Sequence, residues 1–266
     1  MDVIAVVDPL VSQISARTFK QFLHMPFTTL FETIHQTGAF SSFFVCGDAT
    51  KNIEVMCLTE PDSISVDENI ALPAAKAITD RYNITIGGNI PLTTCMLLGN
   101  QQDNIKYVVD LLAQVDHHNL IVAPGCDMPY DTPVENTIGA AQAAHDPDTF
   151  RAVVANYQRA ALDIAVALPD YAHLERPLIE VFTLDSASCA ACAYMLAAAQ
   201  RVADELGARV EMVEYKITVP ENIARMQKMG ITNLPSILVN GELKYSSIIP
   251  SHRELLETVS AQLRAG

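Results

Sequence analysis

Asn119-Leu-Ile-Val-Ala-Pro-Gly-Cys-Asp-Met-Pro129 is the stretch that decides the fold. Its apolar run ends at Pro124-Gly125 and is followed by Cys126. This pattern predicts a buried strand whose carboxyl end delivers a thiol to the next loop. The same order occurs upstream, where Ser42-Phe-Phe-Val45 runs into Cys46. We therefore expect two strands to bring two thiols together at the opening of one active site.

Strand and helix patterns alternate along the first 168 residues. The predicted strands are Val3–Val7, Ser42–Val45, Ser63–Val66, Asn83–Ile86 and Leu120–Ala123. They are apolar enough for burial on both faces, which favours a parallel sheet covered by helices. Thr132-Pro-Val-Glu135 predicts a capping box at the start of the region's last helix.

A polar or thiol residue follows the carboxyl end of each predicted strand. These residues are Asp8, Cys46, Asp67, Asn89 and Cys126. Such an in-phase series is typical of a (β/α) barrel, whose active site lies at that edge of the sheet. For Asp67 alone, capping of the next helix is the favoured interpretation. Thiols are poor caps, so the two cysteines are the stronger candidates.

Composition argues against several classes of protein. Seventeen basic and 31 acidic residues give a formal charge of −14, which repels phosphate backbones and disfavours nucleic acid as a partner. No apolar run reaches the ~18 residues of a membrane helix, and no signal peptide is evident. The six cysteines are therefore expected to be thiols in a reducing cytoplasm.

Several motifs in order resemble the C-terminal part of the uroporphyrinogen decarboxylase family. They are Phe-Phe-Val-Cys46-Gly-Asp-Ala-Thr, Asp-Ser-Ile-Ser-Val-Asp67-Glu, Gly-Gly-Asn89-Ile-Pro, Ala-Pro-Gly-Cys126-Asp-Met-Pro and Thr-Pro-Val-Glu-Asn136. The resemblance covers residues 1–168 and implies part of a (β/α)8 TIM-type barrel. Asp8, Asp67 and Asn89, from their positions after the predicted strands, are the expected substrate-binding residues. Cys126 points to the corrinoid branch, the methylcobamide:coenzyme M methyltransferases.

The resemblance implies a zinc site and a methyl-corrinoid substrate, which we expect to be carried on a separate protein. That branch holds zinc with a His-x-Cys motif and a distant cysteine, which implies Cys46 and Cys126 as ligands. Zinc keeps a bound thiol as the nucleophilic thiolate. Phe44 stands where the motif has histidine, so a third ligand would come from Asp8, Asp48, a substrate thiol or nothing. The alternative is that both cysteines are small buried apolar residues, as we expect of Cys57 and Cys95.

Five strands are readable where the family's barrel has eight, and the family's N-terminal arginine-bearing substrate segment is absent. An open parallel sheet leaves an uncovered edge. The chain is therefore expected to be a fragment, to pair with a separate N-terminal half-barrel, or to self-associate across that edge. A corrinoid protein or a small thiol is the other expected partner.

Residues 169–177 read as a linker, because two prolines and mixed polarity break the pattern. Residues 178–266 form the second predicted domain. Its predicted elements are a strand at Leu178–Thr183, a helix to about Leu206, a strand at Arg209–Ile217, a helix from the capping box Thr218-Val-Pro-Glu221 to Gly230, a hairpin of Ser236–Val239 and Glu242–Tyr245 turning at Asn240-Gly241, and a last helix capped by Ser251.

Cys189-Ala-Ala-Cys192 lies at the start of the first helix of this domain, and Leu234-Pro235 precedes the hairpin. This order resembles a thioredoxin-like domain, in which Pro235 matches the cis-proline that faces the disulfide. The helix N-terminus is expected to lower the pKa of Cys189. By the family pattern, Cys189 is the exposed attacking thiol and Cys192 resolves the mixed disulfide.

Three functions follow from these patterns. The first is methyl transfer from a methyl-corrinoid to a zinc-activated thiol, with an appended redox domain. The second is a decarboxylase-like lyase acting on tetrapyrrole carboxylates, which needs an arginine cluster that this acidic chain does not supply. The third is a thiol–disulfide oxidoreductase on an inactive half-barrel, with chemistry only at Cys189 and Cys192.

Overall fold

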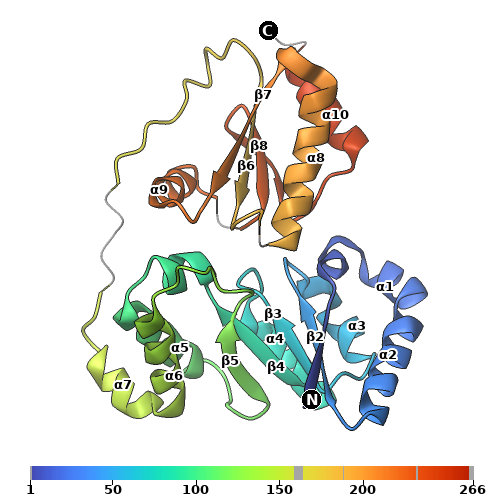
Figure 1. The fold of residues 1–266 in the computed structure, drawn as a ribbon, viewed down its shortest axis with the longest axis vertical. Coiled ribbons are helices and arrows are strands. Elements are labelled where there is room, and N and C mark those ends of the chain that lie inside the picture. Colours follow the sequence, from blue (N-terminus) through green and yellow to red (C-terminus); the bar gives the residue numbers. More distant parts are fainter. Residues whose placement is uncertain (1, 159–163, 188, 232, 264–266) are drawn as a thin grey trace. The chain divides into compact units, whose positions relative to one another are not determined.

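The chain divides into two compact units, residues 1–159 and residues 160–266 (Figure 1). The computed structural model describes residues 2–158, 164–187, 189–231 and 233–263. In the described part of the chain, none of the helices combines the length and the apolar character needed to cross a bilayer.

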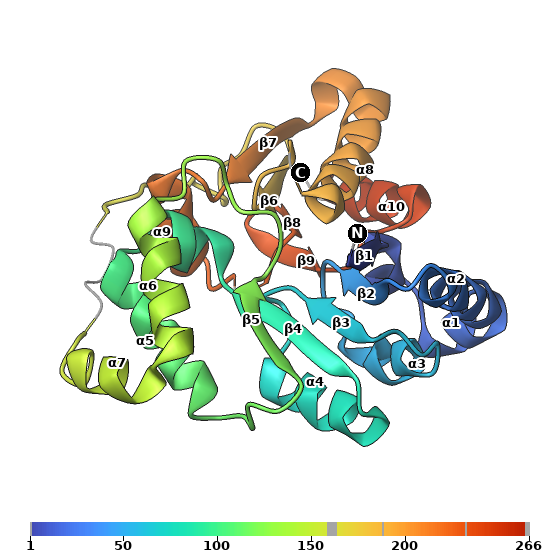
Figure 2. The ribbon, with the colours of Figure 1, turned by 60° about the horizontal axis from the view of Figure 1, so that its bottom comes forward.

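The first unit is built on a five-stranded parallel sheet in the order β1-β2-β3-β4-β5 (Figure 2). Its strands are β1 (Val3–Val7), β2 (Phe40–Val45), β3 (Ser63–Val66), β4 (Thr85–Ile90) and β5 (Leu120–Pro124). Its helices are α1 (Ala16–Phe22), α2 (His24–Gln36), α3 (Ile53–Cys57), α4 (Leu72–Thr79), α5 (Gln101–Leu112), α6 (Val134–His145) and α7 (Pro147–Val153), and a π-helix spans Leu92–Leu97. This architecture confirms the predicted partial α/β barrel.

One face of this sheet carries the core of the unit. Phe43 on β2 is fully buried, and its ring centroid lies 4.5 Å from that of Phe27 and 5.3 Å from that of Phe31, both on α2. The other face carries small polar side chains, among them Ser42 and Ser65, whose hydroxyl oxygens are 3.4 Å apart and only partly buried. The predicted burial on both faces therefore holds for β4 but not for β2 and β3, which bury only alternate residues and leave Ser42, Phe44 and Ser65 partly exposed on the second face.

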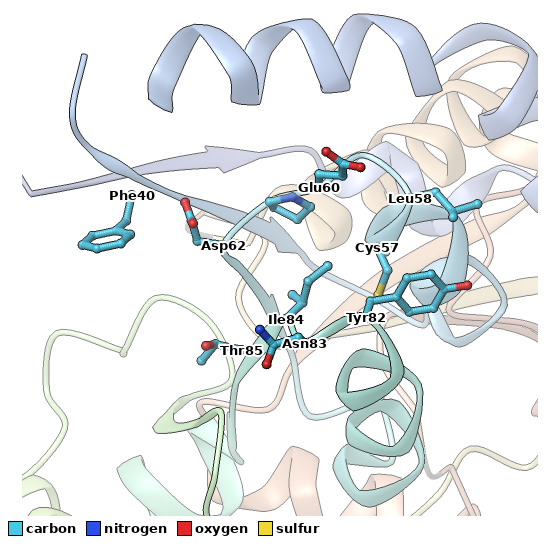
Figure 3. A pocket seen from close by; sticks show the side chains of 10 residues that line it. Phe40, Cys57, Leu58, Glu60, Asp62, Tyr82, Asn83, Ile84 and Thr85 are labelled. Atoms are coloured by element: carbon cyan, nitrogen blue, oxygen red, sulfur yellow. The ribbon is translucent and has the colours of Figure 1, made fainter. Parts of the chain in front are cut away.

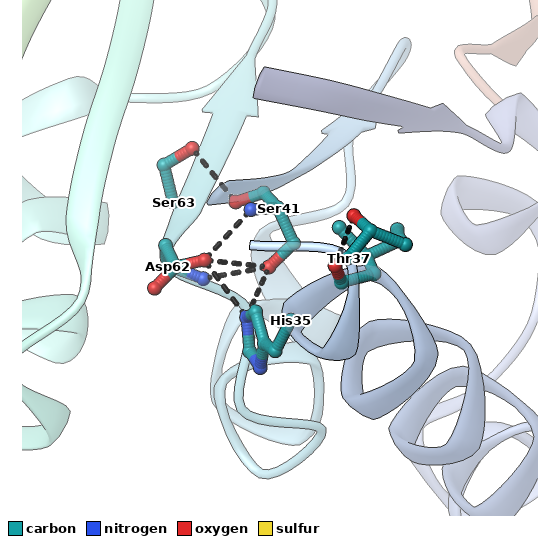
Figure 4. Close-up of polar contacts among 6 residues, drawn as sticks. His35, Thr37, Ser41, Asp62 and Ser63 are labelled. Carbon is teal, nitrogen blue, oxygen red and sulfur yellow. Dashed lines mark hydrogen bonds and ion pairs between the residues drawn. The ribbon is translucent and has the colours of Figure 1, made fainter. Parts of the chain in front are cut away.

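A polar cluster joins the amino ends of β2 and β3 (Figure 4). Asp62 Oδ2 accepts hydrogen bonds from the Ser41 N–H at 2.7 Å and the Ser41 hydroxyl at 3.0 Å, and lies 2.8 Å from His35 Nε2. Burial raises the pKa of Asp62, but the hydrogen bonds from Ser41 and His35 outweigh it, so the pKa is lowered overall. Ser41 and Asp62 contact the same nitrogen of His35, which is the geometry of a structural clasp and not of a catalytic triad.

Two predicted helix caps are wrong. Helix α6 begins at Val134, and Thr132 makes no cap; its buried hydroxyl has no hydrogen-bond partner. Helix α9 (Pro220–Lys228) has Val219 at its N-cap position without a side-chain bond. In both places the helix begins one residue later than the motif requires, so the threonine oxygen lies too far back. Ser251 does cap the last helix, because its hydroxyl accepts from the Glu254 N–H at 3.3 Å.

The second unit has a mixed sheet in the order β7-β6-β8-β9, in which β6 pairs parallel with β7 and antiparallel with β8. Helices α8 and α10 cover one face, and α9 lies on the other (Figure 1). Its strands are β6 (Leu178–Thr183), β7 (Glu211–Lys216), β8 (Ser236–Val239) and β9 (Glu242–Ser246), and its other helices are α8 (Ala190–Leu206) and α10 (His252–Leu263). This arrangement confirms the thioredoxin-like domain.

The predicted hairpin turn is present between β8 and β9. Asn240 and Gly241 both have positive φ, 53° and 75°, as a two-residue turn of this kind requires. Gly241 also packs on Tyr171, since an added Cβ would lie 2.7 Å from its ring. The Tyr171 hydroxyl donates to Glu180 Oε1 at 2.9 Å, so the segment predicted as a linker, 169–177, is fastened to the second unit. Its role as a domain boundary stays a prediction.

Candidate functional site

Two cysteines far apart in the sequence meet at the carboxyl edge of the first sheet. Cys46 directly follows β2 and Cys126 follows β5, and their sulfur atoms are 3.3 Å apart. Cys46 is 4% exposed and Cys126 is half-buried, and no disulfide joins them. The prediction that the two sulfurs are neighbours is confirmed.

The loop after β5 brings about this meeting. Strands β2 and β5 are separated by β3 and β4, so their ends would lie roughly 14 Å apart in a flat sheet, at about 4.8 Å per strand. The Gly125 N–H donates to the Ile90 carbonyl at 3.0 Å, and an added Cβ on Gly125 would lie 2.9 Å from the backbone nitrogen of Glu68. The chain therefore crosses the ends of β4 and β3 to reach Cys46, and only glycine fits at the crossing.

Asp67 fixes the loop that carries Cys46. Its buried carboxylate accepts hydrogen bonds from the Gly47 N–H and from the Asn69 N–H, the latter at 2.9 Å. Burial raises the pKa of Asp67, with a smaller contribution from the charge of Asp48, although the hydrogen bonds oppose the shift. Because Gly47 is the residue after Cys46, this carboxylate positions the thiol. Binding of substrate by Asp67 stays a prediction.

Asn89 lies inside β4, so the prediction that it follows the strand is wrong. Gly87-Gly88 reads as a turn in the sequence, but Gly88 continues the strand close to the Val66 carbonyl, 2.6 Å from an added Cβ. The buried Asn89 amide donates to the carbonyls of Asp67 at 2.9 Å and Ile70 at 2.7 Å. These bonds hold the loop after β3, and binding of substrate by Asn89 stays a prediction.

Neither predicted carboxylate ligand joins the thiol pair. Asp8 accepts from the Leu10 N–H at 3.0 Å, and Asp48 accepts from the Thr50 hydroxyl at 2.6 Å. Among the residues that the structure describes, no group of three or more His, Cys, Asp or Glu side chains is arranged to hold a metal. A catalytic zinc has three protein ligands. The two thiols are suitable donors for two of these positions and do not complete a site.

A partly buried acid beside the site, Glu68, was not predicted from the sequence. Glu68 Oε2 accepts from the Leu92 N–H at 2.8 Å. Burial raises the pKa of Glu68 to about 7, and the charge of Asp67 adds to the shift. The residue borders a cavity of about 300 Å³, whose lining also includes Asn89, Tyr107, Asp110 and Gln114. The adjacent acids Asp67-Glu68 after β3 were the only available signal, and they do not reveal which is poised near neutrality.

A larger cavity of about 570 Å³ lies at the opposite edge of the sheet (Figure 3). Phe40, Asp62 and Thr85 line it where β2, β3 and β4 begin. In parallel barrels this edge contributes stability, whereas chemistry occurs at the carboxyl edge. The cavity therefore does not compete with the thiol pair as a candidate site.

A second thiol pair lies at the N-terminus of α8. Cys189 is the N-cap residue, and its sulfur accepts the Cys192 N–H at 3.4 Å. Cys192 is fully buried and Cys189 is 8% exposed. The prediction that Cys189 is exposed is therefore wrong, although Cys189 is the more accessible of the two thiols. A hydrogen bond with Cys189, followed by burial, raises the pKa of Cys192, which keeps this thiol protonated. The predicted cis bond before Pro235 is confirmed.

Comparison with known families agrees with this division. A family model described as uroporphyrinogen decarboxylase (URO-D) matches residues 1–147, more than half of the chain. The chain belongs to the uroporphyrinogen decarboxylase family. A thioredoxin domain model matches residues 178–260 of the same URO-D family chain.

Two solved structures are similar to parts of the URO-D family chain. A methyltransferase from Methanosarcina mazei is 22% identical, with a TM-score of 0.49, over 55% of this chain and 42% of that protein. A chloroplastic thioredoxin z is 23% identical, with a TM-score of 0.26, over 35% of this chain and 81% of that one. The URO-D family chain thus spans less than half the length of the methyltransferase. No curated protein matches it in sequence.

Proposed function

We propose that this chain acts in methyl transfer from a methyl-corrinoid to a thiol, with Cys46 and Cys126 as zinc ligands. The observation that supports the proposal is the 3.3 Å separation of their sulfurs at the carboxyl edge of a URO-D family sheet. In this reaction the thiolate sulfur of the acceptor forms a bond to the methyl carbon. The cobalt–carbon bond breaks, and its electron pair stays with the corrinoid.

Zinc, when bound, would lower the pKa of a coordinated thiol and hold it as thiolate. Cys46 and Cys126 would hold the ion, and the acceptor thiol itself would take a further position, since the described residues supply no third ligand. Asp67 serves this site through its hydrogen bond to the Gly47 N–H, which sets the position of the neighbouring Cys46.

Zinc content of the purified, reduced 266-residue chain tests the proposal. After incubation with zinc and desalting, elemental analysis is expected to find stoichiometric metal on the wild type and a loss of that metal in Cys126→Ser. Cys57→Ser is the matched control, because burial in α3 raises the pKa of this thiol to about 12 and makes it a poor ligand. A reduced wild type that holds no more zinc than Cys126→Ser contradicts the proposal.

A second function, thiol–disulfide exchange, is favoured by the geometry at α8. The Cys192 N–H bonds to the Cys189 sulfur at the positive end of a 17-residue helix, an environment that favours a thiolate. Reduction of insulin disulfides by the full chain is expected, with loss of activity in Cys189→Ser. Cys95→Ser is the matched control, since this buried cysteine lies in the first unit. Equal rates for the wild type and Cys189→Ser contradict this function.

A decarboxylase-like lyase is less well supported. Tetrapyrrole carboxylates call for an arginine cluster, and the arginines described in the first unit do not form one. Arg17 is exposed on α1, Arg81 pairs with Glu54 at 3.2 Å, and Arg151 pairs with Asp148 at 2.8 Å.

The proposed partners are a corrinoid protein and a chain segment that completes the barrel. In the described sheet, β1 pairs with β2 alone and β5 with β4 alone, and both edge strands present apolar side chains, with Val7 56% and Ile121 50% exposed. We propose that a separate half-barrel or a second copy pairs there. A concentration-dependent mass in sedimentation experiments identifies the second copy, and a monomer at all concentrations excludes it.

A further inference from the structure

This chain carries two cysteine pairs in two different units. The sulfurs of Cys46 and Cys126 are 3.3 Å apart, and a disulfide bond of about 2.05 Å needs only a small further approach. Cys46 comes from the end of β2 and Cys126 from a loop after β5. A loop can change its conformation more readily than a strand within a sheet, so the two sulfurs can approach to bonding distance and form a disulfide.

We propose that Cys46 and Cys126 form a reversible disulfide, and that this disulfide is a substrate of the Cys189–Cys192 dithiol. The inference rests on the thiol–disulfide exchange proposed for Cys189 and Cys192, and it requires neither zinc nor methyl transfer. The Cys189–Cys192 dithiol thereby has a disulfide substrate on a chain of the same sequence. The two pairs need not belong to one molecule, because exchange between two copies of the chain is sufficient.

The first step is oxidation by a small-molecule disulfide. The thiols of Cys46 and Cys126 lose two hydrogens and two electrons and become one disulfide, while the small disulfide is reduced to two thiols. Cys126 is the half-buried member and Cys46 the buried one, so the small molecule and any later attacking thiolate reach the Cys126 sulfur first.

The second step returns the pair to the thiol form. The Cys189 thiolate attacks the Cys126 sulfur, a mixed disulfide forms, and Cys46 leaves as a thiolate. Cys192 then attacks Cys189 and releases Cys126, and the proton lost by Cys192 is taken up by a departing thiolate. The disulfide now joins Cys189 and Cys192, and an external small dithiol reduces it, becoming oxidised in turn.

Oxidation would also regulate the first unit. A disulfide removes both thiolates from the set of donors, so the oxidised chain cannot hold zinc at this edge. A reductase domain on the same chain is a means of restoring them. Cys57 is fully buried in α3 and has no such exposure to oxidant, which makes it an internal reference.

The test uses three variants of the 266-residue chain, one acceptor and two donors. The acceptor carries Cys189→Ser and Cys192→Ser and is oxidised with glutathione disulfide. The donor carries Cys46→Ser and Cys126→Ser and is fully reduced. After desalting and mixing, thiols are blocked at intervals, and disulfides are mapped by mass spectrometry of peptides. A second donor also carries Cys192→Ser, which leaves a mixed disulfide unresolved.

We expect the Cys46–Cys126 disulfide to disappear from the acceptor while a Cys189–Cys192 disulfide appears on the donor. The second donor is expected to form a covalent dimer joined from Cys189 to Cys126, with Cys57 unmodified. If glutathione disulfide does not link Cys46 to Cys126, or if the disulfide remains on the acceptor while the same donor reduces insulin, the inference is overturned. Zinc binding by the reduced wild type would be untouched by either failure. Circular dichroism confirms folding of each variant, and alanine replaces serine where folding is lost.

Discussion

Replacing Glu68 by glutamine is expected to stabilise the first unit at alkaline pH and to leave it unchanged at acid pH. The Glu68 carboxylate accepts the Leu92 N–H at 2.8 Å, and the carbonyl oxygen of a glutamine side chain can accept the same bond. The substitution therefore removes a titration with little change in packing. Burial and the adjacent charge of Asp67 are the causes of that titration.

The sign follows from the direction of the shift. The pKa of Glu68 rises from an ordinary 4.5 to about 7 in the folded chain, so the fold favours the protonated acid. Below pH 4.5 the group is protonated in both states and costs nothing. As the pH rises from 4.5 through 7, the unfolded chain releases this proton while the folded carboxyl retains it, so stability is lost until the group is ionised in both states. A shift of this size corresponds to about 3 kcal/mol at pH 8, at roughly 1.4 kcal/mol per pH unit.

Hydrogen exchange, measured by mass spectrometry at increasing urea concentrations, gives the free energy of unfolding of the first unit from peptides of β3 and β4. At pH 8 the variant is expected to be more stable than the wild type by up to about 3 kcal/mol, and at pH 4.5 by only a few tenths. Comparing variant and wild type at each pH cancels the intrinsic pH dependence of exchange. Glu32→Gln, on the exposed face of α2, is the matched control. A gain that is equal at both pH values, or absent at pH 8, refutes the reasoning.

Three other substitutions test the fold and the site. Phe43→Ala is expected to lower the free energy of unfolding by about 3–5 kcal/mol in urea titrations, because it empties the aromatic core, whereas Phe22→Ala, at a 62% exposed position, changes it little. Asp62→Asn is expected to destabilise the chain more at pH 7 than at acid pH, since the lowered pKa of Asp62 gives stability that is lost as the pH falls through the folded-state pKa; equal losses at both pH values would count against the clasp. Gly125→Ala is expected to slow formation of the Cys46–Cys126 disulfide by glutathione disulfide, because a Cβ there lies 2.9 Å from the Glu68 nitrogen; an unchanged rate would show that the loop tolerates the side chain.

Local signals allowed most of the second unit to be predicted. The Asn240-Gly241 turn and the capping serine at position 251 each set one boundary through residues a few positions apart. In the first unit, the apolar runs located five strands in order. The end of β4 was misplaced, because Gly87-Gly88 has the composition of a turn but lies flat against β3, where a side chain would not fit. Close packing between strands is a tertiary property that composition does not report.

Glu68 shows the same limit at the site. The acidic neighbour Asp67 adds to the raised pKa of Glu68, but the main cause is burial, which the sequence does not report, and the hydrogen bond from Leu92, 24 residues away, opposes the shift. The roles of Asp67 and Asn89 were also hidden. Both residues lie at the carboxyl edge of the sheet, as predicted. However, the Asp67 carboxylate is hydrogen-bonded to the loop after β2, and the Asn89 amide to the loop after β3. A polar residue at a strand end can support a site without facing its substrate.

The thiol pair depends on a loop more than on the sheet. Parallel strands place their carboxyl ends at one edge, but β2 and β5 are not neighbours, and the edge alone leaves their ends roughly 14 Å apart. Gly125 closes this distance by passing against Glu68 with no side chain, its N–H bonded to Ile90. The glycine that ends the apolar run in the sequence is therefore also the residue that sets the position of Cys126. It follows that any chemistry shared by the two sulfurs, whether metal binding or disulfide formation, is controlled at position 125 as much as at the cysteines themselves.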